Sequence, residues 1–272
     1  MTHKKTFQIG GIHLDKHKIS ALNPIIDAGV PELVYIPVRQ HIGAPAVLQK
    51  TKGDKVKIGT LLAAADGVVS ADVHSSVAGE IVKIEEMPGS SGYQELTVVI
   101  KTAPDEFETG IDTGSDIVKE ITASREEIIS AIRKAGIVGM GGAGYPTPIK
   151  TELPENKKAD CLIVNAIECE PYLTADGALM LEKAEQIIIG AKIINKALGI
   201  QNAVIAIDEN KPQAIEKLTK ISKSYIGVNV RVCKSKYPQG GERHHRQRGA
   251  FGKAADRCRL HCSKRCHRLC HL

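Results

Sequence analysis

A glycine-rich loop near the middle of the chain is the feature that most restricts its fold. Gly139–Gly144 contains four glycines and precedes Tyr145-Pro146-Thr147. Glycines leave backbone N–H groups uncovered, so that a phosphate group can approach them closely. An apolar run, Cys161–Val164, follows and leads into the acidic segment Asn165–Pro171. Because ligands of parallel α/β sheets bind beyond the carboxyl ends of strands, the two motifs together indicate a nucleotide-cofactor site.

The segments around this loop alternate between strand-type and helix-type patterns. Ser124–Glu127 is a capping box that predicts the start of a short helix, which Gly136 ends. Apolar residues further along recur at steps of three and four, which is typical of helices. Strands alternating with helices predict a Rossmann-like parallel sheet. The expected elements are a strand at 161–166, a helix at 176–198, a strand at 203–207, a helix at 211–222 and a strand at 228–233.

Residues 26–101 predict a small all-β domain, because short apolar alternations are interrupted by glycine, proline and aspartate. Lys52–Gly59 has the turn and strand chemistry of a lipoyl or biotinyl carrier barrel, and Val73–Ile81 resembles its matching second half. A carrier domain presents a modifiable lysine at its hairpin tip. The tip here, Ser70–His74, has no lysine. We therefore expect that neither lipoate nor biotin is attached.

Several reactive side chains receive no functional role from the sequence. His74 fits a surface or turn position, and Arg39 and His41 are left unassigned. Cys161 and Cys233 lie in apolar runs and are predicted to be core residues.

The composition favours a globular protein with an aliphatic core. A chain of 272 residues can bury a sizeable core and is expected to hold two domains. Tryptophan is absent and aromatic residues make up only 3%. No apolar stretch approaches the ~20 residues needed to cross a bilayer, and the first residues lack the apolar segment of a secretory signal. We therefore expect a cytoplasmic protein that reaches a membrane only through partners.

The net charge of +6 suggests a nucleic-acid partner, but the distribution of charge argues against one. The chain has 37 basic and 31 acidic side chains, and residues 243–272 hold nine of the basic and one of the acidic. The rest of the chain is therefore slightly acidic. Since the basic charge is confined to one terminal segment, we expect no nucleic-acid partner.

The same terminal segment contains cysteines and histidines that suggest a zinc site. Its four cysteines are Cys258, Cys262, Cys266 and Cys270. Perfect fourfold spacing places all four thiols along one helical stripe, which is too nearly linear for tetrahedral zinc. A zinc or nucleic-acid binding module built on this segment is therefore the least favoured alternative, and no metal site is predicted.

The quoted motifs resemble those of a known family. The glycine loop and the acidic segment resemble the flavin-binding domain of the NADH-oxidising subunit of respiratory complex I. The order of the whole chain more closely resembles the C subunit of the Rnf electron-transport complex. That resemblance includes Gly10–His13, Arg39–Pro45 and Tyr237–Glu242, and it stops abruptly after residue 242. We expect the residues from about 243 onward to be frameshifted translation.

The resemblance implies flavin contacts from the glycine loop and from a second loop. Lys150 would supply positive charge toward the flavin or its phosphate. The residues lining the flavin would be Gly139, Gly141, Gly142, Ala143 and Gly144. The second loop would be formed by Tyr237, Gly240, Gly241 and Glu242.

The acidic segment would complete the site. By resemblance, Asn165 and Glu168 would hydrogen-bond the ribityl chain or ring of FMN, and Glu170 would lie near an incoming NADH. The relatives have a further acid where this chain has Ile167, so that one polar contact is missing. That missing contact concerns the nicotinamide. A third flavin-contact loop of the family, which carries an asparagine, would fall within residues 243–272, and FMN binding is therefore expected to be weak or lost in this chain.

The resemblance implies that intact relatives would pass electrons between the flavin or nicotinamide and iron–sulfur clusters. Their 4Fe-4S motifs, of the Cys-x-x-Cys-x-x-Cys-x-x-x-Cys-Pro type, are not found in this sequence. The expected function is therefore an electron-transfer subunit of a membrane-associated complex that couples ferredoxin–NAD electron transfer to ion translocation, here as a fragment without its iron–sulfur domain and without activity. Its partners would be the other subunits at the cytoplasmic face of the membrane, with ferredoxin and NAD as indirect partners.

A soluble relative is the alternative reading of the same motifs. A cobalamin reductase or a proline-reductase electron-transfer protein shares the same flavin-binding core. The expected organisation is an N-terminal segment at 1–25, a barrel-sandwich domain at 26–101, a linker at 102–123, an incomplete flavin-binding α/β domain at 124–242 and a basic tail at 243–272.

Overall fold

The computed structural model describes residues 15–89, 92–114, 116–140, 144–168 and 170–233. The chain divides into two compact units. One unit is formed by Asp27–Glu152, and the other combines Met1–Ile26 with Leu153–Leu272. The domain bounds expected from the sequence remain a prediction.

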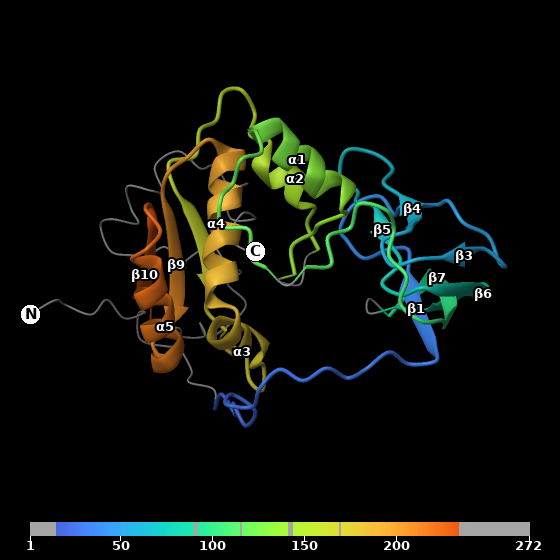
Figure 1. Cartoon of the computed structure of the whole chain (residues 1–272), viewed down its shortest axis with the longest axis horizontal. Helices are drawn as coiled ribbons and strands as arrows, with labels where there is room; N and C mark the ends of the chain where they lie inside the picture. The colour runs from blue at the N-terminus through green and yellow to red at the C-terminus, as the bar shows by residue number, and fades with distance from the viewer. Residues whose placement is uncertain (1–14, 90–91, 115, 141–143, 169, 234–272) are drawn as a thin grey trace, which may run out of the picture. The chain divides into compact units, whose positions relative to one another are not determined.

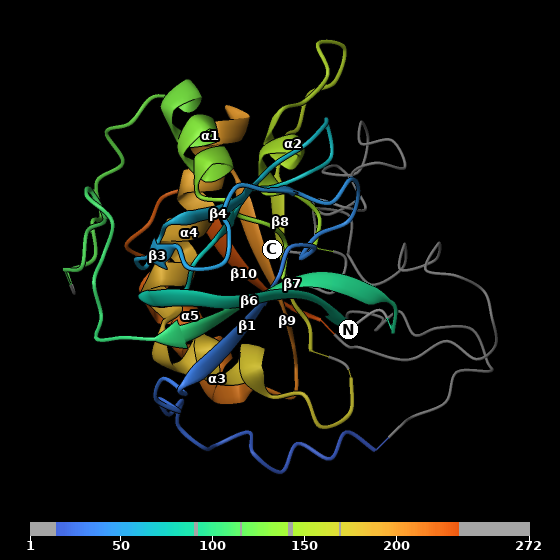
Figure 2. The same cartoon turned by 90° about the vertical axis from the view of Figure 1, so that its right-hand side faces the viewer.

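The unit formed by Asp27–Glu152 is built on two antiparallel sheets. The longest pairing joins β6 to β7, which lie side by side in Figure 2. The larger sheet has the order β1 (Leu33–Pro37), β7 (Gln94–Thr102), β6 (Gly79–Pro88) and β3 (Lys55–Val56). The smaller has the order β2 (Val47–Leu48), β4 (Leu61–Ala64) and β5 (Val73–His74). The predicted all-β barrel-sandwich pattern is confirmed.

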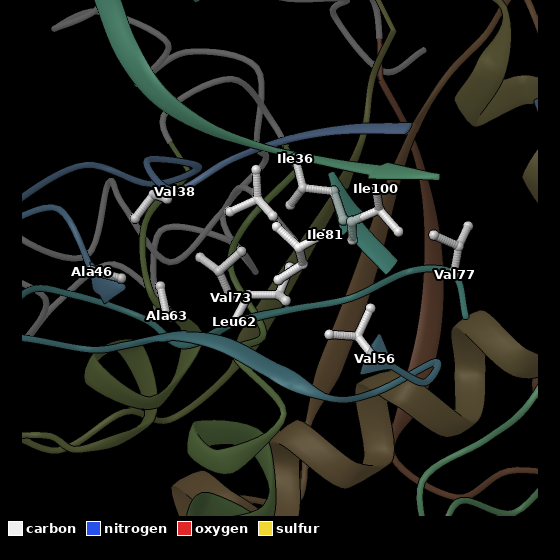
Figure 3. Close-up of a cluster of buried hydrophobic side chains, with 11 residues drawn as sticks. Ile36, Val38, Ala46, Val56, Leu62, Ala63, Val73, Val77, Ile81 and Ile100 are labelled. Atoms are coloured by element: carbon white, nitrogen blue, oxygen red, sulfur yellow. The ribbon is translucent and has the colours of Figure 1, made fainter. Parts of the chain in front are cut away.

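The inner faces of these strands share one aliphatic core, shown in Figure 3. Leu62, Ile81 and Ile100 are completely buried within it. Burying one such side chain contributes about 1.5–3 kcal/mol. Because successive residues of a strand point to opposite faces, alternating apolar positions are enough to build this core without aromatic residues.

Two helices belong to the same unit. Helix α1 (Arg125–Lys134) begins at the predicted capping box, in which Ser124 Oγ accepts from the Glu127 amide at 3.2 Å and Glu127 Oε2 accepts from the Ser124 amide at 2.7 Å. The helix ends just before Gly136, as predicted. Helix α2 (Thr147–Thr151) follows the glycine loop and was not predicted, because five residues are too few to show a helical period.

The second unit contains a three-stranded parallel sheet, as predicted. Its order is β10 (Val228–Cys233), β9 (Ala203–Asp208) and β8 (Leu162–Ala166). Figure 1 shows the sheet with helix α4 (Ala184–Leu198) running along β9, near α3 (Ala175–Glu182) and α5 (Pro212–Ser222). The prediction of one helix over 176–198 is wrong, because the backbone leaves the helical conformation at Lys183 (φ −120°, ψ 30°) and separates α3 from α4.

An N-terminal segment, residues 15–26, packs in this α/β unit. Lys16 Nζ forms an ion pair with Asp208 Oδ2 at 2.6 Å, at the end of β9. Ser20 Oγ lies 2.7 Å from Thr174 Oγ1. The segment therefore reaches the carboxyl-terminal edge of the parallel sheet. Across the parts of the chain that the structure describes, no helix has the length and apolar character needed to cross a membrane.

Candidate functional site

The neck of the glycine loop is closed by backbone contacts. The Gly139 amide donates to the Tyr145 carbonyl at 2.9 Å, and Val138 forms an antiparallel bridge with Pro146. These contacts bring the two ends of the loop together. The predicted flavin-lining residues Gly141, Gly142 and Ala143 lie outside the described residues.

Polar side chains are buried immediately after the loop. Thr147 is 1% exposed, and its hydroxyl oxygen has no hydrogen-bond partner among the described residues. Lys150, the predicted source of positive charge, is 3% exposed. A buried hydroxyl that lacks a partner is costly, since it has lost its hydrogen bonds to water. Its place beside the glycine loop suits a polar ligand such as the FMN phosphate or ribityl chain.

Glu168 lies just beyond β8 and is held by three donors. Its side chain is 3% exposed. Oε1 accepts from the Asp176 amide at 2.9 Å, in the first turn of α3, and Oε2 accepts from Lys211 Nζ at 2.7 Å. Lys18 Nζ lies 3.5 Å from the same Oε2. These contacts give Glu168 a structural role, and its predicted hydrogen bond to FMN remains a prediction.

Lys18 also fixes the backbone of the acidic segment. Its Nζ donates to the carbonyl oxygens of Glu168 at 3.1 Å and of Glu170 at 2.9 Å, and it contacts that of Leu173. Only 14% of its side chain is exposed. One ammonium group thus contacts three carbonyl oxygens of the turn that contains Glu168 and Glu170. The Glu170 residue itself is exposed and accessible to a ligand.

The remaining predicted residue of this segment, Asn165, lies within β8. Its Oδ1 accepts from the Ile167 amide at 3.1 Å, a local contact that supports the backbone where the strand ends. The side-chain amide group of Asn165 is still available for a ligand contact. Its predicted role toward FMN is untested.

Several acidic and lysine side chains lie close together at the strand ends of this unit, and they shift one another's pKa values. Partial burial raises the pKa of Asp176, and the carboxylates of Glu168 and Glu170 raise it further, while Lys211 opposes the shift. Burial likewise raises the pKa of the Cys233 thiol, with a contribution from Asp208. Acids and lysines therefore gather at the edge where ligands of parallel sheets bind.

A cavity of about 200 Å³ opens beside this cluster, within the α/β unit. Lys18, Glu168 and Lys211 contribute to its wall, together with residues at the starts of α3 and α5. Among the described residues, no group of three or more His, Cys, Asp or Glu side chains is placed to hold a metal ion. The four terminal cysteines lie outside those residues.

The predicted site residues fall in both compact units. Gly139, Gly144 and Lys150 belong to the barrel unit, whereas Asn165, Glu168 and Glu170 belong to the α/β unit. The structure brings the acids together through Lys18, and it closes the glycine loop through its own backbone. The predicted second flavin loop lies outside the described residues and comprises Tyr237, Gly240, Gly241 and Glu242.

Sequence reasoning missed the lysines that hold Glu168. Lys18 precedes Glu168 by 150 residues and Lys211 follows it by 43. Single lysines in polar segments give no local signal. The burial of Glu168 after an apolar strand was the one available indication, because a buried carboxylate needs a cationic or hydrogen-bonding partner.

Two family models match the chain. The RnfC barrel sandwich hybrid domain matches residues 5–105, and the Nuo51 FMN-binding domain matches residues 132–259. The first match includes the strands of the half-barrel, and the second includes the glycine loop and the parallel sheet. The predicted fold class is therefore confirmed by two independent models in the expected order.

Curated proteins that are similar to this chain are C subunits of the same kind of complex. The chain is 43% identical to the C subunit of the proton-translocating ferredoxin:NAD+ oxidoreductase complex of Clostridium ljungdahlii, over 88% of this chain and 52% of that one. It is 39% identical to the C subunit of the Na+-translocating complex of Acetobacterium woodii, over 86% and 53% respectively. For the C subunit of the ion-translocating oxidoreductase complex of Rhodobacter capsulatus, the identity is 37%, over 86% and 46%. The chain spans about half the length of these relatives, and over most of its own length it is homologous to Rnf complex C subunits.

Proposed function

We propose that this chain supplies the flavin- and nicotinamide-binding part of the C subunit in an ion-translocating ferredoxin:NAD+ oxidoreductase complex. The observation that carries the proposal is the match of the FMN-binding domain over residues 132–259, which contains both the glycine loop and the acidic segment. Relatives named as subunits of such complexes support the same assignment.

The geometry supports FMN as the cofactor. A glycine loop closed at its neck offers backbone N–H groups to a phosphate, and the Thr147 hydroxyl beside it has no partner among the described residues. Lys150 would add positive charge on the same side. Bound there, the flavin would supply the redox chemistry, which is hydride exchange with a nicotinamide and one-electron exchange with other carriers. The protein then needs only to bind, orient and screen the cofactor.

The acidic segment would supply further contacts to the bound molecules. Asn165 would hold the ribityl chain or ring through its side-chain amide. Glu170, exposed and fixed through its backbone by Lys18, would orient the incoming NADH. Glu168 would set the position of this segment, because its own carboxylate is already satisfied by the α3 amide and two lysines.

Three finer points belong to the proposal. FMN affinity is expected to be weak, since the family's third flavin-contact loop would fall within residues 243–272, where the resemblance has ended. Onward electron transfer requires iron–sulfur clusters, and we expect none to be bound by this chain. Its partners would be the other subunits of the complex at the cytoplasmic face of the membrane, with ferredoxin and NAD as the electron-exchanging partners.

The proposal is tested by titrating the purified chain with FMN and following the quenching of flavin fluorescence. Wild type is expected to show saturable binding, and Gly142→Val should abolish it, because a side chain would occupy the path of the cofactor. Gly190→Ala is the matched control: Gly190 lies in α4 and has open space around its α-carbon. Equal affinities for wild type and Gly142→Val would place the flavin elsewhere.

A further inference from the structure

Both described ends of the glycine loop rest on loops of the barrel. Gly136, before the loop, has φ +63°, and a β-carbon there would overlap the Asp72 carbonyl oxygen. Gly144, at the far end, has φ +57°, and its β-carbon would lie 2.9 Å from the Gln40 carbonyl oxygen. The Gly144 carbonyl also accepts from the Ile42 amide at 3.2 Å. Glycine is therefore required at both positions, because backbone packs directly on backbone.

These contacts define two supporting loops in the barrel. The first barrel loop is residues 40–44. The second barrel loop is residues 65–72, which connects β4 to β5. Gly136, three residues before the glycine loop, lies on the second barrel loop, and Gly144, the last residue of the glycine loop, lies on the first. Both barrel loops therefore support the closed neck of the glycine loop.

His41 joins the two barrel loops through a buried ring. It is 6% exposed, and its Nε2 lies 3.1 Å from the Ala71 amide, which can only donate. Nε2 is therefore the unprotonated nitrogen, and Nδ1 carries the proton toward the Ile42 carbonyl at 3.3 Å. A backbone hydrogen bond from the Ala44 amide to the Val69 carbonyl at 3.0 Å also joins the two barrel loops.

The second barrel loop is tied down at further points. Ser70 Oγ donates to the Ala44 carbonyl at 3.0 Å, and the Ala65 amide donates to Asp72 Oδ1 at 2.8 Å. In a carrier barrel this loop would present a modified lysine to distant sites. Here the second barrel loop contains no lysine and is hydrogen-bonded to the first barrel loop, so it forms a fixed support.

We propose that His41 is a positioning residue for the flavin-binding loop. By joining the two barrel loops, it fixes the support on which the closed neck of the glycine loop lies, and so the position in which the glycine loop receives the cofactor. This inference rests on the proposed function, and it gives the barrel of this family member a purpose that needs no attached carrier group.

The test compares His41→Leu, which cannot accept the Ala71 hydrogen bond, with His41→Gln, whose side-chain oxygen can reach the same amide. His41→Asn keeps a polar side chain but is one methylene shorter than Gln, and it serves if the leucine variant does not fold. His74→Leu is the matched control in the same unit. Two measurements are made: FMN affinity, and hydrogen exchange of the flavin-free chain at the amides of Ala71, Ile42 and Gly139.

The leucine or asparagine variant is expected to weaken FMN binding by about tenfold, the factor that corresponds to one buried hydrogen bond. Exchange should become faster at all three amides, and His41→Gln should restore both measurements. Faster exchange at Ala71 alone, with Ile42 and Gly139 unchanged, would overturn the inference. If wild type binds no FMN, the proposed function fails, and the exchange at Ile42 and Gly139 still decides whether His41 holds the loop.

Discussion

Lys211 Nζ lies 2.7 Å from Glu168 Oε2, and only 11% of the lysine side chain and 3% of the glutamate side chain are exposed. The other carboxylate oxygen accepts from the Asp176 amide of α3. A buried pair of this kind contributes little net stability while it is intact, but removing one partner leaves a charge that is poorly compensated. The start of α5 is thereby connected to the start of α3 through one carboxylate.

We predict that Lys211→Met lowers the free energy of unfolding by about 1–3 kcal/mol, less than for a fully orphaned buried charge, because Lys18 and the Asp176 amide still contact Glu168. Urea denaturation measures the change. Lys57→Met is the matched control, since the Lys57–Glu106 pair at 2.5 Å is exposed, and water screens the attraction so that its loss should leave stability almost unchanged. Equal effects of the two substitutions would contradict this reading of Glu168.

A second prediction concerns Lys18, which gathers the carbonyls of Glu168, Glu170 and Leu173. Lys18→Met should release the acidic segment, because the substitution removes the ammonium group that contacts all three of these carbonyls. Hydrogen exchange at the Tyr172 amide, which donates to the Lys16 carbonyl at 2.9 Å, should become faster by at least about tenfold.

The control for Lys18 is Lys217→Met. Lys217 Nζ contacts the carbonyl of Leu181, in the same unit and away from the acidic segment. Its substitution should leave the Tyr172 amide unchanged. Unchanged exchange at Tyr172 in Lys18→Met would show that the segment is held by its own backbone.

The sequence was sufficient to predict helix α1 and most elements of the α/β unit, because their signals are local. Ser124 and Glu127 are three residues apart, the spacing of a capping box, which predicts the start of α1. The apolar runs ending at Ala166 and Asp208 are strands within one residue of the expected bounds. The break between α3 and α4 was missed because Lys183 is neither proline nor glycine, so that nothing in the pattern distinguishes it from a helical residue.

The candidate site was harder to predict because its supports come from distant segments. Glu168 and Glu170 follow a strand and could be found by position, whereas Lys18 reaches them from the N-terminal segment. His41 likewise supports a loop about a hundred residues further along the chain. Such contacts depend on how the elements pack, and a single sequence contains no pattern that reports them.

A third prediction tests the capping box at the start of α1. Ser124→Ala removes the acceptor of the Glu127 amide and should lower the free energy of unfolding of the barrel unit by about 1 kcal/mol. Thermal or urea unfolding measures the change. Ser130→Ala, at an exposed position within the same helix, should be neutral or slightly stabilising, since alanine is the better helix former. Destabilisation of equal size in both variants would mean that the cap contributes nothing specific.

The last prediction concerns pH and Asp176. Its folded-state pKa is raised above the ordinary value of 3.8 by partial burial and then by the carboxylate of Glu168, so the folded chain holds this proton more tightly than the unfolded chain. The favourable contribution of protonated Asp176 is therefore complete below pH 3.8 and is lost as pH rises through the folded pKa. At neutral pH the ionised group opposes folding, and Asp176→Asn should raise the thermal midpoint.

The gain is expected to be small, below about 1 kcal/mol, because the Asp176 side chain is partly exposed and water screens its charge. It should shrink as the pH is lowered toward 4, where wild type becomes protonated. Midpoints measured by circular dichroism at several pH values between 4 and 8 give the comparison. Asp176→Asn leaves the backbone amide that caps onto Glu168 in place, so a loss of stability at neutral pH would mean that the charge of Asp176 favours α3 through its helix dipole more than its acidic neighbours oppose it.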